Sequence, residues 1–151
     1  MKNRQNAAAP SALPACILQA LSPELAIPAG EYRALTVYSE VPDDWGAALR
    51  IPDDRFAPHL RRGERAVVDE YDLEPVSGEI FVVKIASPSA PAGYVVKLVQ
   101  LCRKRYDGRH GPTLGWWMHF QLDRRTMALS EGPMTDGISD RILGRVVGVL
   151  L

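Results

Sequence analysis

From residue 32 to the C-terminus, the chain consists of short runs of β-branched and aromatic residues, each bounded by glycine, proline or aspartate. Runs of this kind, recurring about every ten residues, are typical of strands joined by turns. A 3.6-residue apolar period, which would indicate amphipathic helices, does not persist in this part of the chain. The sequence therefore predicts an all-β fold, with strands over residues 33–39, 45–51, 65–69, 79–85, 93–101, 116–122, 126–130 and 141–151.

The composition fits one folded domain of this kind. The chain has 151 residues, and 46% of them are hydrophobic, which is enough for a core. Lys+Arg and Asp+Glu both total 18, so the formal net charge is zero. This balance argues against a generally basic nucleic-acid-binding protein, although a local basic patch survives such averaging. Because no apolar run is long enough to cross a bilayer, we expect no membrane contact.

Residues 1–30 differ from the rest, since they are rich in alanine and contain four prolines. Proline removes a backbone donor and fixes φ, so a long helix cannot run through this segment. We expect a partly disordered N-terminal arm over residues 1–30 and one folded domain over residues 31–151. The arm lacks both the paired helices of a helix-turn-helix and the apolar stretch of a secretory signal, which favours a cytoplasmic location.

The cysteines and histidines give no sign of a metal site. Cys16 and Cys102 are the two cysteines, and neither belongs to a CxxC motif. The histidines at positions 59, 110 and 119 are scattered among different elements. We therefore expect no metal and no cofactor, and two reduced thiols, as is usual in the cytoplasm.

Residues 51–69, IPDDRFAPHLRRGERAVVD, carry the most specific pattern in the chain. A short strand leads into Asp54, Pro58 follows, a turn is centred on Gly63, and an apolar strand ends in Asp69. Further along come SGE followed by IFVVKI at 77–85, VVKL at 95–98 and RILGRVVGV at 141–149. None of these motifs is specific alone. Their order and spacing along the chain are the specific feature.

In that order and spacing, residues 45–150 resemble the LexA/UmuD-like serine–lysine autopeptidase domain, which also forms the C-terminal part of phage repressors. The resemblance implies small twisted antiparallel sheets and a cleft with a serine nucleophile and a lysine base. The serine follows the aspartate that matches Asp54, so its position is taken by Arg55. The lysine matches Lys97.

Arginine at position 55 removes the chemistry that the resemblance would otherwise imply. In a serine–lysine dyad, neutral lysine takes the hydroxyl proton as serine attacks the carbonyl. Arginine offers no nucleophile and stays protonated. Arg55 and Lys97 are thus vestigial dyad positions with no intact catalytic group, and we expect Arg55 to pair with a nearby aspartate. The resemblance places four further side chains at the cleft: Asp54, Phe56, Pro58 and Asp69.

The first functional hypothesis is therefore a non-catalytic homologue that acts as a dimerisation or regulatory module in bacterial or phage-derived transcription or stress response, including the SOS response. Two alternatives stay open. One is an active peptidase that uses another nucleophile, cleaving its own arm near Ala29-Gly30. The other is a module whose inert cleft binds a peptide of a protein partner.

The resemblance implies a homodimer formed with the help of the closing strand. Its end, VVGVLL, is predicted to be an apolar edge that needs covering. Adjacent tryptophans on a strand point to opposite faces, so one of Trp116 and Trp117 is expected in the core and the other at an interface. The interface prediction comprises Trp116, Trp117, Arg141, Val146 and Val149.

Two segments are predicted to be mobile loops, residues 87–92 and residues 103–115. The second is the most basic part of the chain, with Arg103, Lys104, Arg105 and Arg109. This segment is either a solvated loop or a loop that contacts nucleic-acid phosphates, and the sequence does not decide between the two. From the overall charge, we expect direct nucleic-acid binding only with the help of another domain.

Overall fold

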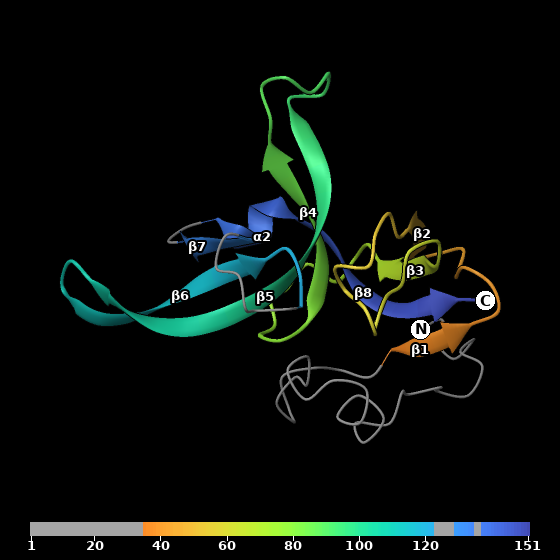
Figure 1. The fold of residues 1–151 in the computed structure, drawn as a ribbon, viewed down its shortest axis with the longest axis horizontal. Coiled ribbons are helices and arrows are strands. Elements are labelled where there is room, and N and C mark those ends of the chain that lie inside the picture. Colours follow the sequence, from red (N-terminus) through yellow and green to blue (C-terminus); the bar gives the residue numbers. More distant parts are fainter. Residues whose placement is uncertain (1–34, 123–128, 135–136) are drawn as a thin grey trace.

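The computed structural model describes residues 35–122, 129–134 and 137–151. Within these ranges the chain is built from strands and one short helix, so the all-β prediction is confirmed (Figure 1). The elements are β1 (Thr36–Tyr38), β2 (Gly46–Arg50), β3 (Arg65–Asp69), β4 (Ile80–Ala86), β5 (Tyr94–Gly108), β6 (Gly111–His119), β7 (Ser130–Met134), α2 (Ile138–Arg141) and β8 (Ile142–Leu150). The expected N-terminal arm and most of the strand expected over 126–130 lie outside the described residues.

The strands form a single sheet in the order β2-β3-β8-β4-β5-β6-β7. Neighbours along this path are antiparallel, and β1 joins β8 in parallel. The sheet is strongly twisted, so that β2 and β3 lie far from β6 and β7 (Figure 1).

The closing strand β8 lies inside the sheet. It pairs with β3 on one side, and with β4 and then β1 on the other. The prediction that this strand forms an uncovered apolar edge is therefore wrong. Its apolar residues face protein because neighbouring strands of the same chain enclose it, and Val146 is only 1% exposed.

Two glycines of β8 allow this close packing. A Cβ at position 144 would lie 2.6 Å from the carbonyl oxygen of Asp69 in β3. A Cβ at position 148 would overlap the carbonyl oxygen of Thr36 and the ring of Tyr38 in β1. The close approach of β3 and β1 to β8 therefore needs glycine at these two positions.

Both faces of the first part of β4 are buried, which explains why residues 80–83 are continuously apolar. Ile80 and Val82 belong to one hydrophobic cluster, while Phe81 and Val83 belong to a second. Since successive side chains of a strand point to opposite faces, β4 separates the two clusters. The first cluster also holds Ile51, Phe56 and Leu60 from the segment between β2 and β3.

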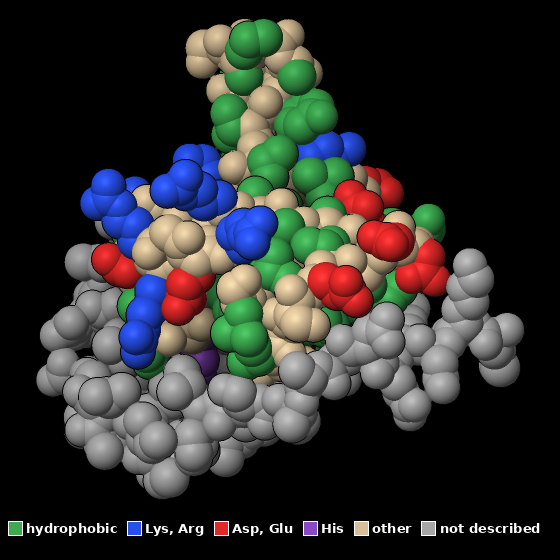
Figure 2. Space-filling model, turned by 90° about the vertical axis from the view of Figure 1, so that its right-hand side faces the viewer, with side chains coloured by type: hydrophobic (Ala, Val, Ile, Leu, Met, Phe, Trp, Pro, Cys, Tyr) green, Lys and Arg blue, Asp and Glu red, His purple; other side chains and the backbone are tan. Residues whose placement is uncertain are grey.

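The first part of β5 pairs with β4 in a hairpin that projects from the body (Figure 1). Its tip is the turn segment 87–92, one of the two predicted loops. Tyr94 and Val96 on this hairpin are 42% and 44% exposed. Hydrophobic side chains run up the projection, and lysine and arginine side chains lie near its foot (Figure 2).

The remainder of β5 pairs with β6 from Gln100 opposite His119 to Gly108 opposite Gly111. Only Arg109 and His110 lie between the paired residues, and Gly111 adopts a φ of 105° that favours glycine. The prediction of a mobile loop over 103–115 is therefore wrong, because cross-strand pairing makes this segment a two-stranded ribbon. The ribbon extends away from the rest of the molecule (Figure 1).

Candidate functional site

The segment between β2 and β3 is closed by hydrogen bonds at its base. The Ile51 N–H donates to the Glu64 carbonyl at 2.8 Å, and the Gly63 N–H donates to the Ile51 carbonyl at 2.9 Å. Inside the loop, Asp54 Oδ1 accepts the Arg62 N–H at 2.9 Å. These bonds give the segment that resembles a nucleophile loop a fixed backbone.

Arg55 is held in this loop through its backbone. Its N–H donates to Asp53 Oδ1 at 3.0 Å, and its carbonyl oxygen accepts the Leu122 N–H at 2.9 Å. Its guanidinium Nε lies 3.4 Å from Asp53 Oδ2. The expected pairing with a nearby aspartate is thus observed, with Asp53 as the partner. Since both side chains are about half exposed, the ion pair contributes less than about 1 kcal/mol to stability.

Arg55 and Lys97 line the same pocket, which has a volume of about 180 Å³. The two residues come from the loop after β2 and from the first part of β5. The apolar part of the lining is made by Leu49, Pro52, Phe56, Val96, Leu98 and Phe120. Charged residues complete it, with Arg50 and Asp53 beside Arg55 and Lys97. The pocket therefore combines an apolar wall with three cationic residues and one carboxylate.

The other residues predicted at the cleft divide into two groups. Phe56 lines the pocket and is buried in the first hydrophobic cluster. Asp54 holds the loop through the Arg62 amide, and Pro58 is half-buried nearby. Neither of these two lines the pocket. The pocket residues Leu49, Val96 and Phe120 were not anticipated, because hydrophobic side chains on separate strands carry no motif in the sequence.

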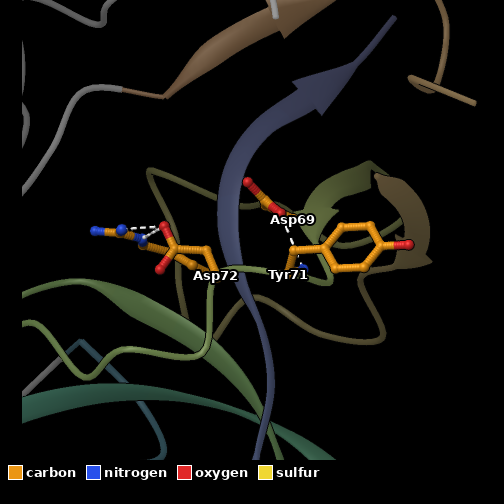
Figure 3. A network of polar contacts seen from close by, with 4 residues as sticks. Asp69, Tyr71 and Asp72 are labelled. Atoms are coloured by element: carbon orange, nitrogen blue, oxygen red, sulfur yellow. Dashed lines mark hydrogen bonds and ion pairs between the residues drawn. The ribbon is translucent and has the colours of Figure 1, made fainter. Parts of the chain in front are cut away.

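Asp69 lies in a different polar network, at the end of β3 (Figure 3). Its Oδ1 accepts the Tyr71 N–H at 3.0 Å, so it stabilises the turn that follows the strand. Burial and, to a lesser degree, the charge of Asp69 raise the pKa of Tyr38. Asp69 thus has a structural role here, away from the pocket.

The same turn carries an ion pair that the sequence did not suggest. Asp72 Oδ2 accepts the Arg145 Nε–H at 2.9 Å, and a second guanidinium nitrogen also contacts this oxygen (Figure 3). The side chains of Arg145 and Asp72 are 11% and 20% exposed. The Arg145 guanidinium also lies 5.9 Å from the centroid of the Phe81 ring. This pair ties the turn after β3 to the middle of β8.

The residues of the predicted interface lie in different surroundings. Val146 is in the core, whereas Arg141 and Val149 are half-buried. Trp116 packs against the second hydrophobic cluster, and the Arg103 guanidinium lies 5.8 Å from its ring centroid. Trp117 makes an edge contact with Tyr106, with ring centroids 5.6 Å apart. Neither tryptophan is fully buried or fully exposed.

His59 is a buried titratable residue in the segment between β2 and β3. Burial lowers its pKa to about 4, so its imidazole is neutral at pH 7. Among the described residues, no group of three or more His, Cys, Asp or Glu side chains could hold a metal ion. No helix in the described ranges is long and apolar enough to cross a membrane.

Comparisons with known proteins give no assignment: no protein-family model, no curated protein and no solved structure matches this chain. The residues and the pocket that they form are therefore the only basis for a functional proposal.

Proposed function

We propose that the protein is a non-catalytic homologue of the LexA-like peptidases and acts as a dimerisation or regulatory module in bacterial or phage-derived transcription or stress response. One observation carries the proposal: Arg55 and Lys97, the two positions that match the dyad, line one pocket. The resemblance to the peptidases rests on the order of motifs in the sequence. It implies that these two positions, which are distant in the chain, lie close together in the fold.

The chemistry of the pocket supports a binding role. Among the described residues that line the pocket, none carries a hydroxyl or a thiol beside Lys97, and Arg55 cannot attack a carbonyl. Loss of the nucleophile from such a dyad costs about 10⁶-fold in rate. The fixed loop and apolar wall remain, and they are the parts that a binding site needs.

The test of inertness is incubation of the purified chain at pH 10, where lysine side chains begin to lose their protons. Intact mass spectrometry should find the full-length chain after a day, because Lys97 has no nucleophile to activate. A chain shortened near Ala29-Gly30 would instead support the alternative of a surviving autopeptidase. The Lys97→Ala variant is the control, since it separates self-cleavage from a contaminating protease.

The dimer needs a surface other than the edge of β8, because that strand is enclosed by its own chain. Exposed apolar side chains on the β4–β5 hairpin, including Tyr94 and Val96, offer such a surface. Sedimentation at tens of micromolar should detect a dimer. The Val96→Lys variant should weaken it, while a strictly monomeric wild-type protein would contradict this part of the proposal.

A second candidate function is peptide binding, and the position of β2 favours it. This strand lies at one end of the sheet order, and two of its residues, Leu49 and Arg50, line the pocket. An extended peptide could therefore add a strand to β2 and place a side chain in the pocket. Peptides selected from a display library should shift the amide NMR signals of residues 46–50, and selected peptides that leave these signals unchanged would exclude this mode.

A further inference from the structure

The ribbon arm, defined here as residues 103–116 of β5 and β6, has a net positive charge, whereas the rest of the chain is net negative. It contains Arg103, Lys104, Arg105 and Arg109, with Asp107 as its single carboxylate. Since the chain as a whole has a net charge of zero, the remaining residues carry an excess of three negative charges. Net positive charge is therefore concentrated on a projecting element (Figure 1).

The four cations of the arm are available to a ligand. Within the described residues, the ion pairs of 4 Å or less are Arg55–Asp53 and Arg145–Asp72, and neither involves the arm. Arg103, Arg105 and Arg109 are exposed, and Lys104 is half-buried. The Lys104 Nζ lies 5.9 Å from the centroid of the Trp117 ring, which restrains its side chain without neutralising it.

The register distributes these charges over both faces of the arm. Arg103 lies opposite Trp116, and Arg105 lies opposite Leu114, so these residues share one face. Lys104, opposite Gly115, lies on the other face. Arg109 occupies the two-residue turn at the tip. A partner that meets all four cations must therefore present negative charge on both sides of the ribbon and around its end.

Duplex DNA has this arrangement, and we propose that the arm binds duplex DNA by entering the major groove and contacting phosphates on both walls. The major groove is about 12 Å wide and admits a two-stranded β-ribbon. A flat anionic membrane would meet only one face. Single-stranded nucleic acid depends on exposed aromatic faces for stacking, whereas Trp116 and Trp117 are both half-buried and lie beside cations.

The binding is through phosphates and independent of sequence. The proposal does not depend on the resemblance to peptidases, because no residue of the pocket takes part in it. The sequence left open whether the basic segment over residues 103–115 contacts nucleic-acid phosphates. The paired ribbon formed by this segment supports such a contact.

The test is fluorescence anisotropy of a labelled 20-base-pair duplex of arbitrary sequence, titrated with the full chain between 20 and 200 mM KCl. If all four cations contact phosphates, log K should fall with log [KCl] with a slope of about −3.6, since each contact contributes about −0.9. In the Arg105→Gln/Arg109→Gln variant the slope should fall to about −1.8, and the affinity at 50 mM KCl should drop at least about tenfold.

The matched control is Arg61→Gln/Arg62→Gln, which removes the same charge from two exposed arginines of the loop between β2 and β3. It should change the affinity less than about threefold and leave the slope near the wild-type value. Equal losses in the two variants, or no binding at 20 mM KCl, would overturn the proposal. Equally tight binding of poly-glutamate or of a single-stranded 20-mer would also overturn it, since the partner would then be any polyanion.

Discussion

At the scale of single residues, the loop around Arg55 is held through its backbone and not through the side chain at position 55. The backbone of position 55 is fixed by Asp53 and Leu122, and neither bond depends on the side chain at that position. The guanidinium is half exposed and paired with Asp53, so the pocket accommodates it without burying an unpaired charge. Substitution of Arg55 should therefore leave the fold of this loop intact.

His59 gives a prediction about pH. Burial lowers its pKa to about 4, compared with 6.5 in the unfolded chain, so the folded state prefers the neutral imidazole. Between pH 6.5 and 4 the unfolded state binds more protons, and stability must fall as the pH falls. We expect His59 to account for a loss of about 2 kcal/mol between pH 7 and pH 5.

The measurement is urea unfolding at pH 7 and pH 5 for the wild type and for His59→Gln. The loss of stability on acidification should be smaller in the variant, because glutamine has no proton to gain. The carboxylates, which are common to both proteins, cancel in this comparison. Equal losses in the two proteins would show that His59 is accessible to protons in the folded state.

At the scale of elements, the Asp72–Arg145 pair connects the turn after β3 to β8. Removing the carboxylate in Asp72→Ala leaves a guanidinium that is 11% exposed without its partner, which should cost about 2–3 kcal/mol of unfolding free energy. The double variant Asp72→Ala/Arg145→Met should regain part of this loss, because no unpaired charge remains. Additive effects of the two single substitutions in denaturant unfolding would contradict a coupled pair.

Strands whose pattern is local could be predicted from the sequence. The apolar run RAVVD gives β3 with its observed bounds, and IFVVKI gives all of β4 except its last residue. The second half of β5 was missed because its residues are basic and polar, as in a loop. This segment is a strand because β6 pairs with it, and such pairing depends on contacts that no local pattern contains.

The position of β8 could not be predicted for a similar reason. Its apolar sequence suits both an edge strand awaiting a partner and an interior strand. The sheet order decides between the two, and it brings β1, β3 and β4 from distant parts of the chain to enclose β8. Gly144 and Gly148, where a Cβ would meet β3 and β1, fit this enclosure.

At the scale of the whole molecule, β5 connects two projections with different surfaces. Its first part belongs to the apolar β4–β5 hairpin, and its last part belongs to the basic ribbon arm. Lys97 and the pocket lie between them. A protein that pairs with a second copy through the hairpin could thus present two basic arms to one partner, which would raise the apparent affinity of each arm.

The candidate site was predictable only in part. The comparison of motifs named Arg55, Phe56 and Lys97, and all three line the pocket. It also named Asp54, Pro58 and Asp69, whose positions in the motif serve the loop backbone and the turn after β3. A sequence motif does not distinguish residues that line a pocket from residues that hold the backbone of a loop or turn.

The most direct test of the account restores the missing hydroxyl. The Arg55→Ser variant should place a serine in the pocket with Lys97, and a small fluorophosphonate should then label Ser at position 55, as intact mass and peptide mapping would show. Wild-type protein and the Arg55→Ser/Lys97→Ala variant should stay unlabelled under the same conditions. A folded Arg55→Ser protein that reacts no faster than the wild type would contradict the claim that this pocket is a peptidase cleft without its nucleophile.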